Sequence, residues 1–199
     1  MIPDALKEPV RASAEEAQNF ITLFYRALND SKPISSFYIN NNPTYRAAGH
    51  KPADICINGA LFATPEEYDA VLAKQRSTST TTTTAPTPTP GTTRPTPSPV
   101  RHDVAAFDAH VLNPDYRFAA PPELLAPSSG SGGKSAQGVR VMVLVSVSGT
   151  LVLGADPRHQ EKRRFTENFI LVPNWDAIAR HGSKATRRFL IASDQYRCD

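Results

Sequence analysis

The amino-terminal part of the chain has the hydrophobic spacing of an amphipathic helix. Apolar side chains recur every three or four residues, which places them on one face of a helix: Ala17, Phe20, Phe24 and Leu28. Ser13 and Glu16 precede most of this stripe with the spacing of a capping box, in which each side chain satisfies a free amide of the first turn. The pattern predicts a helix over residues 14–29 that packs against a core.

A second helix has a clear start signal. Thr64, Pro65 and Glu67 supply an N-cap, a first-turn proline and a capping-box acid. Apolar residues then continue with helical spacing, so we predict a helix that ends at about Arg76.

The segment between these helices carries weaker signals. Short apolar pieces at 34–39 and 55–57 flank a polar stretch whose structure the pattern does not specify. The dipeptide Asn58-Gly59 favours a tight hairpin turn, because both central positions of such a turn need positive φ.

Four segments of the second half have strand character. They are rich in β-branched and aromatic residues and are separated by turn residues: residues 102–113, 139–153, 165–172 and 189–198. Within 139–153, Ser148-Gly149-Thr150 predicts a bend, bulge or turn. Helices followed by a run of strands are typical of an α+β domain, with helices on one face of a mainly antiparallel sheet.

The strand at 139–153 is apolar on both faces. One set of alternate residues consists of valines, and the other set mixes apolar and polar side chains: Arg140, Met142, Leu144, Ser146 and Ser148. A sheet with one solvated face alternates cleanly between apolar and polar residues, so both faces are predicted to be covered. Two helices cover only one face, and the mixed face resembles a protein interface. A third helix within 34–54 is the alternative cover.

Two segments lack the apolar residues that a core needs. Residues 77–99 contain 11 Thr, 6 Pro and 3 Ser, and residues 119–138 are rich in Pro, Ser and Gly. We predict a disordered insertion and a loop within a single domain spanning 1–199, because such segments bury little and lose much entropy on ordering. A spacer is favoured over an SH3 or WW ligand for 77–99, since Pro-Thr repeats are more often spacers.

Charge and cysteine content exclude several function classes. The chain has 22 Lys and Arg against 19 Asp and Glu, and its net charge of +3 is too small to drive tight nucleic-acid binding alone. Cys56 and Cys198 lack metal-ligand spacing, so we expect no metal, no cofactor and no obligatory disulfide. We expect a soluble intracellular protein without membrane contact, because neither a signal peptide nor a membrane-length apolar run is present.

Catalysis has little support in the sequence. Asp54, Asp108 and His110 could supply a base and its partner, but they match no catalytic motif. The sequence also has no glycine-rich phosphate loop and no nucleophile elbow. We therefore predict no catalytic residues.

Basic residues gather in the last quarter of the chain. They form one run at an apparent hairpin turn and another before the last strand: Arg158, Lys162, Arg163, Arg164, Lys184, Arg187 and Arg188. Together they predict a patch that contacts RNA phosphates with strong salt dependence. A solvated rim is the alternative, because no aromatic residues are interleaved for base stacking.

Six segments together resemble one known fold: FITLFYRALN, ICINGALFATPEEYDAVL, FDAHVLN, VSVSGTLVL, RRFTENFILVPN and FLIASDQYR. Their order and spacing are similar to those of the nuclear transport factor 2-like superfamily, and within it to the small subunits of mRNA export receptors, the fungal mRNA transport regulators. This resemblance implies a cone-like fold with helices on a bent sheet. It also implies a non-enzymatic subunit that pairs sheet to sheet with the similar domain of the large subunit of the receptor.

The resemblance further implies location and contacts. It places the protein in the nucleus and at the nuclear pore, shuttling to the cytoplasm, with Phe-Gly repeat nucleoporins bound by the heterodimer. The same superfamily contains homodimeric import carriers for the small nuclear GTPase, and pocket isomerases and dehydratases. These remain the alternatives at this point.

The predicted partner interface combines resemblance with strand alternation. The resemblance implies that Gln195 and Arg197 face the partner sheet. An arginine suits such a position, because its planar guanidinium can hold an acidic residue with two hydrogen bonds. A solvated terminal arginine is the alternative. Alternation adds residues of the last strand and of the mixed face: Phe189, Ile191, Ser193, Arg140, Met142, Leu144 and Ser146.

Overall fold

The second half of the chain forms most of a six-stranded sheet. The computed structural model describes residues 4–78, 100–125, 140–154, 158–179 and 187–199. The strands are β1 (Asp54–Ile57), β2 (Ala60–Phe62), β3 (Val100–Asn113), β4 (Met142–Leu153), β5 (Glu161–Pro173) and β6 (Phe189–Cys198). Their spatial order is β2-β1-β6-β5-β4-β3, and all neighbours are antiparallel except β1 and β6. The predicted α+β class is confirmed.

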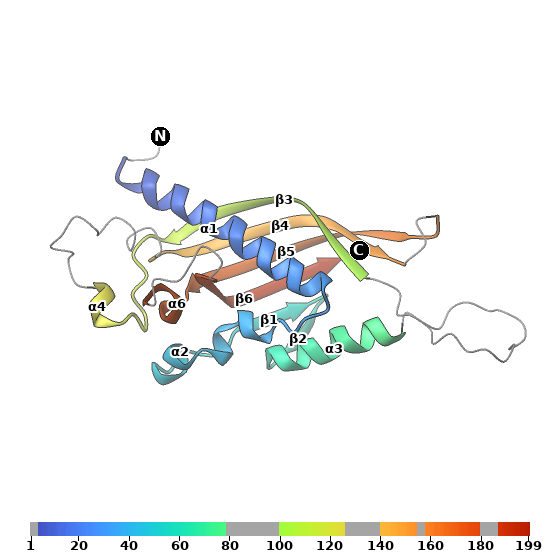
Figure 1. The fold of residues 1–199 in the computed structure, drawn as a ribbon, viewed down its shortest axis with the longest axis horizontal. Helices are drawn as coiled ribbons and strands as arrows, with labels where there is room; N and C mark the ends of the chain where they lie inside the picture. Colours follow the sequence, from blue (N-terminus) through green and yellow to red (C-terminus); the bar gives the residue numbers. More distant parts are fainter. Residues whose placement is uncertain (1–3, 79–99, 126–139, 155–157, 180–186) are drawn as a thin grey trace, which may run out of the picture.

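The long helices lie on one side of this sheet (Figure 1). They are α1 (Asp4–Asn29) and α3 (Pro65–Thr78), with the short helices α2 (Pro43–Ala47), α4 (Pro122–Leu125) and α6 (Trp175–Ala179) and the 3-10 turns η1 (Ser35–Phe37) and η2 (Ile39–Asn41). The predicted start of the first helix is wrong, because α1 begins at Asp4 and Ser13 is buried within it.

Local signals at α3 and at the hairpin are confirmed. The Glu67 amide donates to the Thr64 hydroxyl at 3.3 Å, and Glu67 accepts from the Ala63 amide at 3.0 Å. Asn58 and Gly59 join β1 to β2 with φ values of 51° and 84°, as the tight turn requires.

Gly149 of β4 leaves no room for a side chain between β3 and β5. A Cβ atom there would lie 2.4 Å from the Asp103 carbonyl oxygen and 2.6 Å from the Phe165 ring. The bulge falls on β3, where the register shifts between Val104 and Ala106 opposite this glycine. The predicted irregularity therefore exists, but β4 itself runs continuously through it.

The core fills the space between the helices and the sheet. Aromatic rings of α1 dominate it: Phe24 packs edge-on against Phe37 of η1 at 5.3 Å and against Phe169 of β5 at 5.1 Å between ring centroids. Tyr45 of α2 and Trp175 of α6 are also buried. Such rings bury large areas and prefer edge-to-face contacts, so α1 is fixed firmly on the sheet.

Two carboxyl groups lie inside this core. Tyr25 of α1 donates a short hydrogen bond to Glu167 of β5, and Tyr38 donates to Asp194 of β6 at 2.6 Å. Both carboxylic residues are buried. The hydrogen bonds tie the helical layer to the two central strands.

Candidate partner interface

The sheet presents a second face, which we call the outer face. Along β4, Val143, Val145 and Val147 are buried in the core, and the alternating residues on the outer face are half-buried: Met142, Leu144 and Ser146. Half-burial without a covering layer is what an unpartnered interface would show.

The strand register defines the residues of the outer face. Directly opposed residues in neighbouring strands share a face, so Leu144 continues through Ile170 to Ser193, and Ser146 continues through Asn168 to Gln195. Thr166 of β5 then lies opposite Arg197. The predicted residues Met142, Leu144, Ser146, Ser193, Gln195 and Arg197 therefore come together on one surface.

No helix among the described residues covers the outer face. The alternative, in which a third helix within 34–54 covers the outer face, is wrong. The helix found there, α2, lies on the same side of the sheet as α1 and α3 (Figure 1). Its Tyr45 belongs to the core and donates to the Pro173 carbonyl at 2.8 Å.

Two residues predicted for the interface lie in the core instead. Phe189 and Ile191 are 1% and 0% exposed. The register of β6 shifts at Ala192, because Ile170 pairs with Ser193 whereas Leu171 pairs with Ile191. The extra residue reverses the alternation, so simple parity fails for the start of β6.

Arg140 is also misplaced by the prediction. It precedes β4, and its guanidinium turns to the Leu124 carbonyl of α4 at 3.0 Å. Its side chain therefore stabilises the chain locally rather than lying in line with Met142 and Leu144.

Arg197 is the free cation that the interface prediction requires. It is exposed near the end of β6 and forms no hydrogen bond or ion pair with the residues that the structure describes. One of its guanidinium nitrogens lies 3.5 Å from where a side chain on Gly59 would begin. An arginine in this position is available for a carboxylate of a partner.

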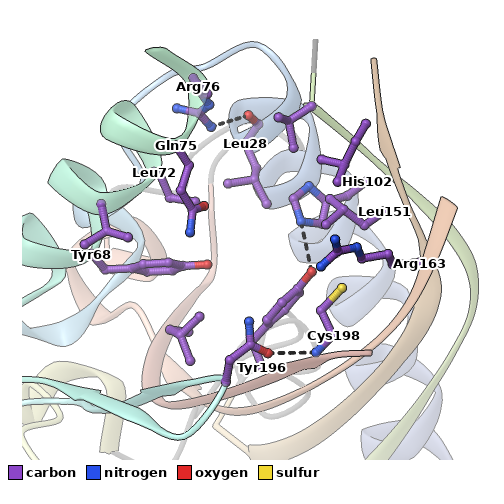
Figure 2. Close-up of a pocket in the computed structure, with 15 residues that line it drawn as sticks. Leu28, Tyr68, Leu72, Gln75, Arg76, His102, Leu151, Arg163, Tyr196 and Cys198 are labelled. Atoms are coloured by element: carbon purple, nitrogen blue, oxygen red, sulfur yellow. Dashed lines mark hydrogen bonds between the residues drawn. The ribbon is translucent and has the colours of Figure 1, made fainter. Parts of the chain in front are cut away.

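A pocket opens on the opposite side of the sheet, between α3, the end of α1 and the strands (Figure 2). Its volume is about 400 Å³, and its lining includes Tyr68, Leu72, His102 and Tyr196. The Tyr196 hydroxyl and His102 Nε2 are 3.4 Å apart. Burial lowers the pKa of His102 to about 4, so the imidazole is neutral near pH 7.

The residues weighed for acid–base catalysis do not line this pocket. His110 Nε2 lies 3.0 Å from a carboxylate oxygen of Asp108; both side chains are exposed on β3, opposite Leu144 and Ser146. Asp54 is exposed and lies opposite Ser193. All three are on the outer face, which disagrees with a catalytic role for them in the pocket.

The predicted basic patch is divided between distant sites. Arg163 pairs with Glu161 at 2.7 Å and lines the pocket, whereas Arg164 lies on the other face of β5. Arg188 pairs with Glu16 at 3.4 Å, and Arg187 lies 4.0 Å from the centroid of the Phe37 ring. Both lie beyond the far end of β5, about 40 Å along the strand from its start. The prediction of a single basic patch is therefore wrong. Arg158 and Lys162 lie near the β4–β5 hairpin, and Lys184 lies outside the described residues.

Comparison with known proteins identifies the family. No family model matches the chain, and no curated protein matches it by sequence. A chain of the Chaetomium thermophilum Mex67 NTF2-like domain complexed with Mtr2 is 40% identical, with a TM-score of 0.76 and coverage of 94% of this chain and 99% of that chain. The chain belongs to the Mtr2 family.

Two further solved structures agree with this assignment. A structure of Mtr2 is 42% identical with a TM-score of 0.76, and a chain of the Sac3N peptide bound to Mex67:Mtr2 is 43% identical with a TM-score of 0.75. Both comparisons cover 94% of this chain and 99% of the other. The resemblance to nuclear transport factor 2-like small subunits of mRNA export receptors is confirmed.

No helix in the described ranges is long and apolar enough to cross a membrane. The same residues contain no group of three or more histidine, cysteine or acidic side chains placed to hold a metal ion.

Sequence reasoning missed the buried carboxyl groups of this Mtr2-family chain. Glu167 alternates with Phe165 and Phe169, so strand parity alone places it on the core face. Asp194 gave no such signal, because the bulge at Ala192 obscures the alternation of β6.

Proposed function

We propose that this chain is the small, non-enzymatic subunit of a heterodimeric nuclear mRNA export receptor, and that its outer face binds the nuclear transport factor 2-like domain of a Mex67-type large subunit. Membership of the Mtr2 family carries the proposal, since a related chain is found in a complex between Mtr2 and the Mex67 NTF2-like domain. The half-buried outer face supplies the physical reason, because a second sheet would remove its apolar side chains from water.

The outer face has two chemically different parts. Leu144 and Ile170 oppose each other on neighbouring strands and give an apolar centre. Gln195 and Arg197 are exposed on β6 and give a polar, cationic edge. The partner that fits this surface carries apolar residues opposite the centre and a carboxylate opposite Arg197.

Cargo and pore contacts follow from the same role. In the heterodimer, apolar sites bind the Phe-Gly repeats of nucleoporins. This binding lets the heterodimer and its mRNA pass through the pore, so the protein shuttles between nucleus and cytoplasm. RNA contact by this chain is restricted to the basic residues near the β4–β5 hairpin: Arg158, Lys162 and Arg164. Such contact is electrostatic and weakens steeply with salt.

Size-exclusion chromatography with light scattering tests the heterodimer. The full chain, mixed with the Mex67-type domain of the same organism, is expected to elute as a one-to-one complex. Leu144→Glu, which places a charge in the apolar centre, should abolish the complex, and Arg197→Glu should weaken it about tenfold or more.

Arg46→Glu is the matched control for charge reversal. Arg46 is exposed on α2, away from the outer face, and makes no side-chain bond to the described residues. This variant should form the complex normally. A stable homodimer of the wild type that ignores the added domain would contradict the proposal.

A further inference from the structure

The pocket on the helical side of the sheet has the features of a small-molecule site. Its volume of about 400 Å³ falls within the range of ligand pockets, and seven of its fifteen described lining residues are aliphatic, among them Leu28, Val71, Leu72 and Leu151. It lies on the side of the sheet that carries α1 and α3, opposite the outer face (Figure 2). This site is separate from the proposed partner interface.

The charges at the pocket favour an anion. None of its described lining residues is acidic, whereas Arg76 and Arg163 both contribute to it. Arg163 is already neutralised by Glu161 at 2.7 Å. Arg76 has no counter-ion among the described residues, and its guanidinium donates only to the Leu28 carbonyl at 2.8 Å.

The free guanidinium of Arg76 is partly desolvated. Burial lowers the pKa of Arg76, although it stays charged near pH 7. Asp69 is its nearest acidic neighbour on α3, but both carboxylate oxygens of Asp69 accept backbone amides, from Ile34 at 2.9 Å and Ser35 at 3.0 Å. A half-buried cation without a counter-ion is costly, so an incoming carboxylate would be stabilised there.

The opposite wall adds no competing charge. His102 is buried and neutral, and it contacts Tyr196 rather than a carboxylate. Tyr68 and Tyr196 are also uncharged near pH 7, because burial raises the pKa of both phenols. The pocket therefore combines an apolar body with one cation, Arg76, that has no counter-ion among the described residues; Figure 2 shows Arg76 at the end of α3.

We propose that this pocket binds a small molecule with an apolar body and one carboxylate, such as a medium-chain fatty acid. The apolar chain lies against Leu28, Leu72 and Leu151, and the carboxylate takes the Arg76 guanidinium as its partner. Ligand pockets of this kind are mostly apolar, with a few polar groups that fix orientation. The inference does not depend on the heterodimer.

Isothermal titration calorimetry on the full chain tests it with three probes of equal chain length. Octanoate should bind saturably at one site, 1-octanol should bind about tenfold more weakly, and octylammonium should not bind, because only the carboxylate pairs with Arg76. Equal affinity for octanoate and 1-octanol, or no saturable octanoate binding, would overturn the proposal.

Three variants locate the binding. Arg76→Gln should weaken octanoate binding about tenfold while leaving 1-octanol unchanged. Val71→Trp fills the pocket from α3 and should remove binding of both, with thermal unfolding as the check that it folds. Arg46→Gln, remote from the pocket, should bind like the wild type. Unchanged octanoate affinity in a folded Arg76→Gln variant would also overturn the proposal.

Discussion

Glu167 and Asp194 are neighbouring carboxyl groups that share one buried environment. They occupy adjacent strands on the core face, and each accepts a tyrosine hydroxyl through one oxygen. The other oxygen of each group, Oε1 of Glu167 and Oδ1 of Asp194, is buried without a donor. A single proton held between the two groups satisfies both oxygens and avoids two adjacent buried charges.

This pair predicts a decline of stability as the pH rises above about 4. Burial and the Asp194 carboxyl raise the pKa of Glu167 well above its usual range, and burial raises the pKa of Asp194 to about 6. The folded chain therefore holds protons that the unfolded chain releases above about pH 4. The stabilisation from one such group is fully present below about pH 4. The free energy of unfolding should then fall by about 3 kcal/mol between pH 4 and pH 6 as this stabilisation is lost. Urea unfolding across this range measures it.

Glu167→Gln separates the pair from other titrating groups. The glutamine amide keeps an oxygen for Tyr25 and offers an N–H to Asp194, so it imitates the protonated acid. We expect a smaller fall of stability with pH and a more stable chain at pH 8. Glu161→Gln, at an exposed ion pair, is the control. An unchanged slope in Glu167→Gln would refute the shared proton.

Leu144 and Val145 are consecutive residues that face opposite sides of β4. Val145→Ala should destabilise the isolated chain by about 2 kcal/mol, because its side chain is fully buried in the core. Leu144→Ala should change stability by less than about 1 kcal/mol but weaken the heterodimer about tenfold. Denaturant unfolding and calorimetric titration with the large-subunit domain give the two values. The assignment of faces is wrong if both variants lose stability equally.

Gly149 and Gly49 require glycine for different reasons: Gly149 has no room for a side chain, and Gly49 has a positive φ. Gly149→Ala should cost about 2 kcal/mol or more, because the new methyl group collides with the Asp103 carbonyl and the Phe165 ring. Gly49→Ala meets no atom within 4 Å, but its φ of 73° costs about 1 kcal/mol. Thermal unfolding of both variants compares them. A milder effect at Gly149 than at Gly49 would argue against close packing of β3 on β4.

Asp69 fixes the start of η1 to α3. Its carboxylate accepts the amides of Ile34 and Ser35, and Ile34 is fully buried. Asp69→Ala should therefore destabilise the chain by about 1–3 kcal/mol through the two unsatisfied amides. Asp30→Ala, which removes an exposed pair with Lys32, should cost less than about 1 kcal/mol. Equal losses in denaturant unfolding would show that the cap contributes little.

Patterns with a local cause were the ones that sequence could predict. The helix at Pro65 and the turn at Asn58-Gly59 depend on bonds within a few residues, and both are confirmed. The alternation of β4 also placed Leu144 correctly, because no bulge interrupts that strand.

Features set by distant contacts could not be predicted. Arg187 and Arg163 are both basic and close in sequence, yet the length of β5 and β6 separates them. The ring of Phe37, which lies against the Arg187 guanidinium, comes from a segment that no local pattern connects to Arg187. The pocket around Arg76 likewise forms only where α1, α3 and the sheet meet.

The extra residue at Ala192 divides β6 into two parts under different constraints. Before it, the residues Phe189, Leu190 and Ile191 are all buried, so a substitution there changes the stability of this chain itself. After it, Asp194 and Tyr196 are buried in the core, while Gln195 and Arg197 are exposed on the outer face. Deleting Ala192 would make Ile191 and Ser193 consecutive residues opposite Leu171 and Ile170, so both parts of β6 would keep their present faces and only the bulge would be lost.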